Sequence, residues 1–242
     1  MIAAHQIAFG KAAGKGLSAK SYIQDGLIVH FDGIESLDYG VRSDNNMWHC
    51  LKSGNSVNMS NGGLPEGVYG WTEHGWLGGG SDGITIPNLA DVFANGMTIE
   101  CLARQYNDNN EDNLCGFNGD EMFIFVTQLA YTRVLYVWKS VIIIDPRIAI
   151  GNRDAMLFTA VIKPGGTMDC YINGELVHSD ASAGSAPTSN IIYIGRSYRS
   201  YKCQRELMNY RVYDKPLSVP DIQENYSIDK ARLAYERDIL HT

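Results

Sequence analysis

Apolar and polar residues alternate with a period of two along much of the chain, which is the pattern of half-buried β-strands. One uniformly apolar face is formed by Met97, Ile99, Cys101 and Ala103, so we expect this face to lie in the core. Further strands are predicted over 27–31, 83–86, 190–195 and 207–213. Residues 156–162 are apolar on both faces apart from Thr159, which predicts a central strand covered on both sides.

Two further features indicate antiparallel β-structure. Asn173-Gly174 lies between two strand patterns, and both residues tolerate the positive φ that a type I′ hairpin turn requires. The most apolar stretch, 123–144, is interrupted by Gln128, Arg133 and Lys139. Because a membrane helix needs about 20 nearly uninterrupted apolar residues, we expect two or three buried strands there and no membrane insertion.

Helix is predicted only near the carboxy-terminal end. Ser218 can cap a helix that has Asp221 three residues later, and 231–240 predicts a second short helix. Many short strands with little helix predict an all-β fold, specifically a two-sheet antiparallel sandwich. A length of 242 residues fits one such sandwich. We therefore divide the chain into an extended arm over 1–20 and one sandwich domain over 21–242.

Three blocks of sequence follow one another in a recognisable order. They are 25–33 with 48–55, 157–161 with the Tyr171–Gly174 hairpin, and 192–196 with 210–218, which contains Tyr213-Asp214-Lys215-Pro216-Leu217-Ser218. This order resembles the laminin G-like branch of the concanavalin A-like lectin/glucanase superfamily. The resemblance implies a jelly roll of two antiparallel sheets and implies no function. The chain departs from many of these relatives at Cys50, where they carry Asp two residues after the tryptophan.

The net charge and the cysteine content indicate which partners the protein can bind and in which cellular compartment it folds. The net charge of −7 disfavours binding of nucleic acid by the whole domain. The five cysteines are odd in number and form no C-x-x-C pair, so we expect reduced, mostly buried thiols. No signal-peptide pattern occurs in the first 20 residues. We therefore expect the chain to fold in the cytoplasm.

The amino-terminal arm is basic. It carries Lys11, Lys15 and Lys20, and residues 1–24 contain no acid. We expect this arm to dock on neighbouring protein subunits, which predicts an oligomer. The alternative is a disordered tail.

The paired carboxylates of a glucanase are not apparent in the sequence. Retaining glucanases need two carboxylates about 5–5.5 Å apart, which a strand supplies through a Glu-x-Asp-x-Glu run, and no such run is present. We predict that the protein is not an enzyme.

One loop is a candidate calcium site. Asp108, Asn110 and Asp112 present carboxylate and amide oxygens at alternate positions, as the start of an EF-hand loop does. The match then fails, because Asn113 and Gly119 stand where the loop needs Gly and a bidentate Glu. Calcium is thus the only cofactor considered, and the alternative is a solvated polar hairpin loop.

Two segments are candidate ligand contacts. Tyr69 and Trp71 lie among glycines and could pack against sugar rings, whereas we assign Trp76 to the core. The alternative is that these aromatic residues close the edge of the sandwich. A second segment interleaves cations and aromatic rings, which suits an acidic glycan or acidic protein face, or else is a solvated loop. Its residues are Arg196, Tyr198, Arg199 and Tyr201.

These observations favour a non-catalytic binding or structural module of a larger assembly, such as a decoration, fiber or attachment protein of a bacteriophage virion. Its partners would be protein subunits, a surface glycan, or both. The alternative is a stand-alone soluble lectin that binds glycans. A glycoside hydrolase of the same fold is a distant third hypothesis.

Overall fold

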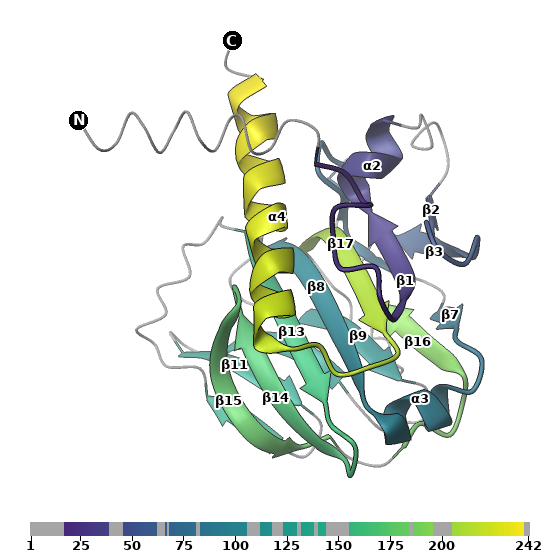
Figure 1. Ribbon diagram of the computed structural model, residues 1–242. Coiled ribbons are helices and arrows are strands. Elements are labelled where there is room, and N and C mark those ends of the chain that lie inside the picture. The colour runs from purple at the N-terminus through teal and green to yellow at the C-terminus, as the bar shows by residue number, and fades with distance from the viewer. Residues whose placement is uncertain are drawn as a thin grey trace.

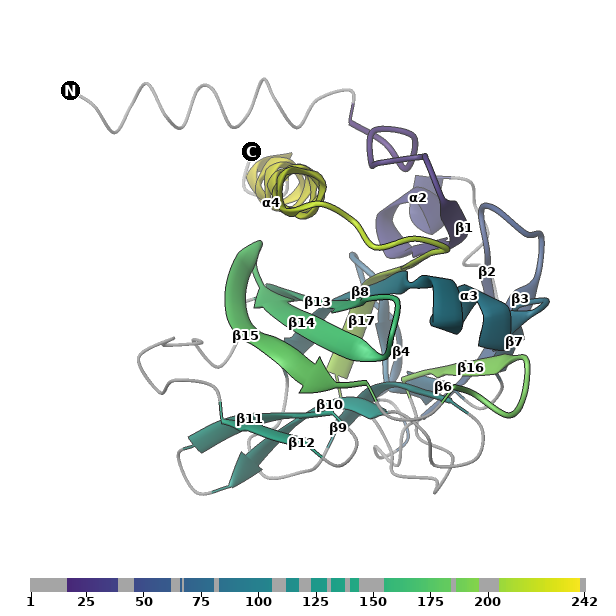
Figure 2. The same ribbon diagram turned by 60° about the horizontal axis from the view of Figure 1, so that its bottom comes forward.

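The structure is a computed structural model of the 242-residue chain. It describes residues 17–38, 46–61, 66, 68–80, 83–105, 112–117, 123–129, 132–137, 140–143, 155–183, 186–195 and 205–239. Two β-sheets stack face to face, and a long carboxy-terminal helix lies across the outer face of the larger sheet (Figures 1 and 2). The fold is therefore a three-layer arrangement of helix, sheet and sheet.

The larger sheet has eight antiparallel strands. Its main order is β15 (Glu175–Ser182), β14 (Thr167–Ile172), β13 (Ala155–Ile162), β8 (Met97–Gln105), β17 (Arg205–Tyr213), β5 (Trp76–Leu77) and β4 (Gly70–Trp71). The eighth strand, β1 (Leu27–Asp32), pairs with β17 beyond the end of β5. The strand β13 is central, as predicted, because it pairs with both β8 and β14 and is buried from Met156 to Ile162.

The second sheet has six strands. Their order is β12 (Ser140–Ile143), β11 (Thr132–Val137), β10 (Phe123–Leu129), β9 (Asp112–Phe117), β16 (Ile191–Ile194) and β7 (Gly83–Thr85). The apolar stretch 123–144 thus supplies three neighbouring strands, which confirms the prediction of strands there, whereas their predicted burial stays a prediction. A small third sheet, in the order β2 (Met47–His49), β3 (Ser56–Ser60) and β6 (Gly79–Gly80), stands beside the two layers (Figure 1).

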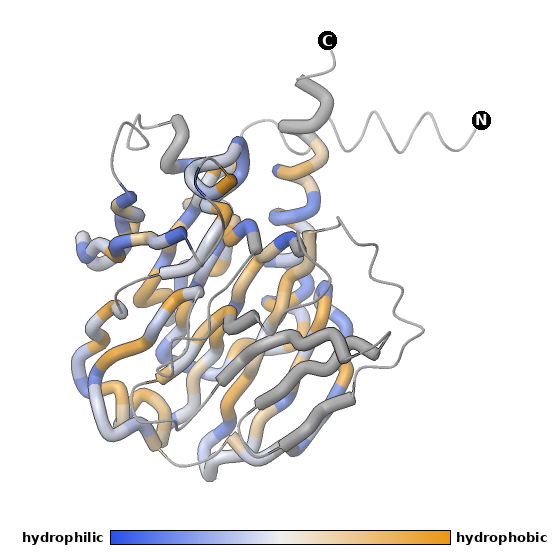
Figure 3. The backbone as a smooth tube through the Cα atoms, turned by 180° about the vertical axis from the view of Figure 1, so that it is seen from behind, coloured by the Kyte–Doolittle hydropathy of each residue, from blue (hydrophilic) through white to orange (hydrophobic). Residues whose placement is uncertain are grey.

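The main hydrophobic core lies between the two large sheets. The predicted inward face of β8, Met97, Ile99, Cys101 and Ala103, is fully buried there. It packs with side chains from both sheets, among them Phe117 of β9 and Phe158 of β13. Figure 3 shows that hydrophobic residues dominate the strands of this region, whereas the long helix carries a mixture of hydrophobic and polar residues. The alternation in the sequence therefore identified the inner face correctly.

The predicted hairpin at Asn173-Gly174 connects β14 to β15. Asn173 has φ 53° and Gly174 has φ 78°, as a type I′ turn requires. The Asn173 side chain also accepts a hydrogen bond of 3.0 Å from the backbone N–H of Leu157. The turn is therefore tied to the neighbouring strand β13.

Two short helices outside the carboxy-terminal end correct the prediction that helix is confined to that end. The first, α2 (Gly33–Asp38), begins where the Asp32 carboxylate accepts a 2.8 Å hydrogen bond from the backbone N–H of Glu35. The second, α3 (Leu89–Asn95), inserts Leu89 and Phe93 into the core. Both helices are too short to give a periodic pattern, and local capping together with burial stabilises them.

The carboxy-terminal end forms one helix, α4 (Val219–Ile239), of 21 residues. Its start is the predicted capping box, because the Ser218 hydroxyl donates to Asp221 at 2.7 Å and accepts from the Asp221 N–H at 3.4 Å. The predicted second short helix over 231–240 is the continuation of α4. No Gly or Pro interrupts the sequence after Pro220, so nothing in the chain ends the helix earlier.

Candidate functional site

The outer face of the larger sheet, which α4 covers, is held by buried ionic groups. Arg211 of β17 donates from Nε to Glu100 of β8 at 2.7 Å and from Nη2 to Asp229 of α4 at 2.6 Å. All three residues are at most 2% exposed. Asn225, one turn before Asp229, donates to the same Glu100 carboxylate at 3.0 Å. The helix is therefore docked on the sheet through charge-assisted hydrogen bonds, together with apolar contacts of Ile222 and Leu233.

A second buried arginine joins α4 to the amino-terminal part of the domain. Arg232 binds the carboxylate of Asp32 at the end of β1 and lies 3.5 Å from Glu35. The ring of Tyr22 lies between the two arginines, with its centroid 4.2 Å from Arg211 and 5.6 Å from Arg232. Burial alone would raise the pKa of Asp32, but Arg232 and the nearby His30 hold it below its usual value.

These ion pairs bring two carboxylates close together, as the active site of a glycosidase does. Here, however, the carboxylates are buried beneath α4. Glu100 and Asp229 converge on one guanidinium group beneath α4. Burial raises the pKa of Glu100 while Arg211 opposes that rise. A glycosidase needs its two carboxylates beside a bound sugar, whereas these side chains are at most 2% exposed. The arrangement stabilises the helix–sheet interface.

The described cysteines are buried free thiols, as predicted for Cys50, Cys101, Cys115 and Cys170. Burial raises the pKa of Cys115 and of Cys170 to about 12, so both thiols stay protonated and unreactive near neutral pH. Cys50 accepts hydrogen bonds at its sulfur from the backbone N–H groups of His30 at 3.4 Å and Ser53 at 3.5 Å. At this departure from its relatives, the chain thus uses a thiol to anchor the turn over 50–55.

The aromatic residues that the sequence singled out form part of a cluster. Trp71 lies edge-on to Trp48 at 6.0 Å and to Trp76 at 5.2 Å between ring centroids. Trp76 is 1% exposed, so its assignment to the core is confirmed. Tyr69 and Trp71 are half-buried and pack against the main core. Their contact with a ligand stays a prediction.

The other predicted site residues are placed only in part. Arg196, Tyr198, Arg199 and Tyr201 lie outside the described residues, as do Asp108, Asn110, Lys11 and Lys15. Asp112 begins β9 and its backbone pairs with Val126, and Lys20 lies exposed in a turn. Among the residues that the structure describes, no group of three or more His, Cys, Asp or Glu side chains could hold a metal ion. The calcium loop and the docking arm therefore stay predictions.

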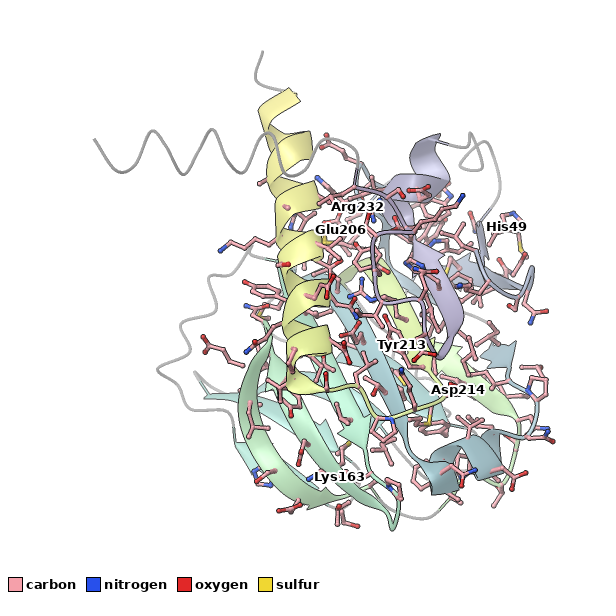
Figure 4. All side chains as sticks on the ribbon, viewed as in Figure 1. His49, Lys163, Glu206, Tyr213, Asp214 and Arg232 are labelled. Atoms are coloured by element: carbon pink, nitrogen blue, oxygen red, sulfur yellow. The ribbon has the colours of Figure 1, made fainter. Side chains whose placement is uncertain are left out.

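A cleft of about 550 Å³ opens where the rims of the two sheets meet, and we call it the rim cleft. It lies between β1, β7, α3 and the turn over 50–55. Figure 4 labels Asp214, one of its residues, between the lower end of β1 and α3. Its described lining is Ile28, Val29, Ser53, Asn55, Thr85, Ile86, Pro87, Val92 and Asp214.

The lining of the rim cleft combines apolar residues at its base with polar side chains that form no hydrogen bond to other described residues. Val29 and Ile86 are buried, and the polar side chains around them are exposed. Within the described part of the chain, the side chains of Asn55, Thr85 and Asp214 form no hydrogen bond. An amide, a hydroxyl and a carboxylate are thus free to bind a ligand, which is the usual character of a small-molecule cleft.

Two stacked antiparallel sheets with little helix place the chain in the class of β-sandwich proteins. Residues 78–223 match the sequence model of the Concanavalin A-like lectin/glucanases superfamily. Since this match covers more than half of the 242 residues, the chain belongs to that superfamily. A search of curated protein sequences found no match.

Solved structures share this fold at low sequence identity. Trypanosoma rangeli sialidase in complex with sialic acid superimposes with a TM-score of 0.62 at 9% identity, over 93% of this chain and 38% of the sialidase chain. The binding domain of botulinum neurotoxin serotype D/C VPI 5993 gives 0.54 at 13% identity, over 83% of this chain and 51% of that chain. The chain therefore spans about two fifths to one half of these proteins. At such identities the likeness establishes the fold alone.

Sequence reasoning missed the rim cleft and the ionic layer beneath α4. Each polar residue of the cleft is an ordinary surface residue by itself, and only the topology brings 53–55, 85 and 214 together. The ionic layer does have a sequence signal, because Asn225, Asp229 and Arg232 recur at the spacing of one helical face. That face is polar, so a search for amphipathic helices passes over it.

None of the helices in the described ranges combines the length and apolar character that a membrane crossing requires.

Proposed function

We propose that the chain is a non-catalytic binding domain that holds an oligosaccharide in the rim cleft. The observation that carries this proposal is the set of exposed, unbonded polar side chains of Asn55, Thr85 and Asp214 around an apolar floor. Sugars present hydroxyl groups beside apolar C–H faces, and this lining matches both. Membership in a superfamily of lectins and glucanases and the sialic-acid complex of one structural neighbour support the same ligand class.

The geometry of the cleft favours a short oligosaccharide. Its volume of about 550 Å³ lies within the ordinary range for small-molecule sites. The exposed ring of Pro87 and the half-buried Ile28 and Val92 offer apolar contacts. Thr85 and Asn55 can donate and accept hydrogen bonds with sugar hydroxyl groups, whereas Asp214 can only accept.

The absence of catalysis is part of the proposal. Several pairs of carboxylates in the described structure converge on one shared cation. Glu100 and Asp229 share Arg211, Asp32 and Glu35 share Arg232, and Asp169 and Asp180 share Lys163. The rim cleft contributes Asp214 as its one described carboxylate, whereas the common glycosidase mechanisms use a pair. A glycoside hydrolase remains the alternative, and incubation with oligosaccharides followed by product analysis would reveal it.

A glycan array followed by calorimetry tests the proposal. The double variant Asn55→Ala/Thr85→Ala removes two hydrogen-bonding side chains, and each is expected to weaken binding about threefold to tenfold. The matched control is Gln223→Ala/Ser227→Ala, which changes an amide and a hydroxyl exposed on α4. Equal loss of affinity in both variants, or no glycan bound by the unchanged protein, would refute the rim cleft as the binding site.

We further propose that this domain acts as an attachment module of a larger assembly, such as a bacteriophage virion. The basic arm with Lys11 and Lys15 supports this, and so does the occurrence of the same fold within longer chains. Deletion of residues 1–16 is expected to reduce the molecular mass measured by light scattering while sugar affinity is retained. An unchanged mass with intact sugar binding would favour the stand-alone lectin instead.

A further inference from the structure

A second, smaller pocket lies on the other side of the turn over 50–55, and we call it the lysine pocket. Its volume is about 270 Å³, and its described lining includes Lys20, Gln24, His30, Glu35, Leu51 and Lys52. The same turn supplies Ser53 and Asn55 to the rim cleft. Strand β1 likewise contributes His30 to the lysine pocket and Ile28 and Val29 to the rim cleft. The two hollows are therefore neighbours along one strand and one turn.

Within the described part of the chain, both lysines of the pocket are cations without an ion-pair partner. Lys20 and Lys52 are exposed, and neither ammonium group forms an ion pair with another described residue. Lys163 and Lys215, by contrast, are each bound to aspartates. Two free positive charges that face one small pocket attract an anion, and burial of the anion beside them strengthens that attraction.

The two lysines are presented by turns that are already fixed. The turn that carries Lys20 is closed by a 2.9 Å hydrogen bond from the Ser21 N–H to the Ser18 carbonyl. Gln24 clamps the same segment through its amide group, which donates to the carbonyls of Ala19 and Tyr22 at 3.2 and 2.9 Å. Lys52 follows Leu51, whose N–H donates to the His30 carbonyl at 2.7 Å. A ligand that binds here does not have to order these turns.

The charged groups beside the two lysines, Asp32, Glu35 and Arg232, carry two negative charges and one positive charge, so the pocket keeps an excess of positive charge. Glu35 also lines it, but its Oε2 already accepts hydrogen bonds from the Ala19 N–H at 3.2 Å and from Arg232 at 3.5 Å. His30 is 1% exposed, and its Nε2 lies 3.6 Å from Asp32 and has no hydrogen-bond partner among the described residues. Burial lowers the pKa of His30 from 6.5 to about 3, so the ring is neutral near pH 7. The lysines therefore set the charge of the pocket.

We propose that the lysine pocket binds the anionic group, carboxylate or sulfate, of an acidic oligosaccharide whose neighbouring sugar units lie in the rim cleft. This inference rests on the proposed function and specifies its ligand class. The pocket is smaller than the usual range for drug-sized ligands, which suits one charged group or one sugar unit. An acidic segment of a protein partner is the competing occupant.

The experiment measures how strongly a negative charge on the sugar favours binding. Trigalacturonate and its uncharged methyl ester are titrated by calorimetry into the full chain, at low salt and at about 0.5 M salt. A sulfated trisaccharide, inorganic sulfate and a glutamate-rich peptide serve as additional probes. The variants are Lys20→Ala/Lys52→Ala and Lys52→Glu, and the control is Lys230→Ala, an exposed lysine on α4.

We expect an acidic trisaccharide, carboxylated or sulfated, to bind at least about tenfold more tightly than the methyl ester at low salt. This ratio should fall towards one in both lysine-pocket variants and in high salt, and it should persist in Lys230→Ala. Sulfate alone should bind weakly and compete. Circular dichroism checks that each variant is folded, which the exposure of both lysines favours.

Three outcomes overturn the inference. They are equal affinity for charged and uncharged sugars in the unchanged protein, a charge preference that survives loss of both lysines, and tighter binding of the glutamate-rich peptide than of any acidic sugar. The proposed function fails separately. If the methyl ester binds and the double variant Asn55→Ala/Thr85→Ala weakens that binding, the rim cleft is supported as the sugar site even when the protein shows no preference for charged sugars.

Discussion

The two faces of the eight-stranded sheet are both buried, but they are buried by different chemistry. The inner face packs apolar side chains such as Phe31 and Ile99 against the second sheet. The outer face packs Glu100 and Arg211 against polar side chains of α4, and apolar clusters that include Leu157 pack beside them. Apolar contacts are non-directional and roughly additive with area, whereas buried ions demand complete pairing. The comparison teaches that one sheet can be covered by apolar side chains on one face and by a mixture of ion pairs and apolar side chains on the other.

The largest effects are expected on the inner face. Phe31→Ala removes a fully buried ring that packs 5.5 Å from Trp48. The variant should lose about 3–5 kcal/mol of unfolding free energy, measured by urea denaturation. A loss below about 1 kcal/mol would show that this face is loosely packed and would break the comparison.

Arg211→Met tests the outer face. The change leaves Glu100 and Asp229 without their cation, and breaking such a buried pair costs about 3–5 kcal/mol. The distinguishing variant replaces all three members with Leu, Met and Leu, and this variant should recover most of the lost stability. If the triple variant is less stable than Arg211→Met in urea denaturation, the outer face behaves like the inner one and the distinction fails.

Burial of His30 makes the unfolding free energy of the domain depend on pH. Burial lowers its pKa to about 3, so the unfolded chain binds a proton between pH 6.5 and 3 that the folded chain does not bind. Unfolding free energy should therefore fall by about 2 kcal/mol between pH 7.5 and pH 5 from this residue. The pH dependence of urea denaturation should be correspondingly shallower in His30→Gln, and the same slope in both proteins would contradict the assignment.

The smallest effect concerns the helix itself. Ser218→Ala removes the capping hydroxyl of α4 and should cost about 1 kcal/mol. Because docking of α4 depends on the ionic layer, thermal denaturation should show a much smaller loss than Arg211→Met does. Comparable losses would mean that the cap, and not the ion pairs, determines whether α4 stays in place.

The inner face could be predicted from the sequence because it depends on local alternation. The apolar set at 97, 99, 101 and 103, the central strand at 156–162 and the Asn173-Gly174 turn each carry their signal within a few residues. The structure places all three as predicted. The superfamily was also accessible, because the blocks at 157–174 and 192–218 lie inside the matched residues 78–223, whereas the block at 25–55 lies outside them.

The outer face and the rim cleft could not be predicted in this way, because each joins residues that are far apart in the chain. Arg211 binds Glu100 across 111 positions, and the rim cleft combines the turn at 53–55 with Thr85 and Asp214. The sequence alone does not tell whether an aromatic residue proposed as a ligand contact binds a ligand or packs in the core, because aromatic residues are common in both places. Trp71 illustrates this, since its ring packs edge-on against Trp48 and Trp76.

The most direct test of the central claim is a titration of isotope-labelled protein with an oligosaccharide that the array identifies, with the sugar spectrum recorded in the same sample. The account predicts that amide signals shift around Asn55, Thr85 and Asp214, while those of Glu100 and Asp229 stay in place and the sugar remains intact. Shifts confined to other parts of the domain, or the appearance of cleaved sugar, would contradict a non-catalytic rim cleft.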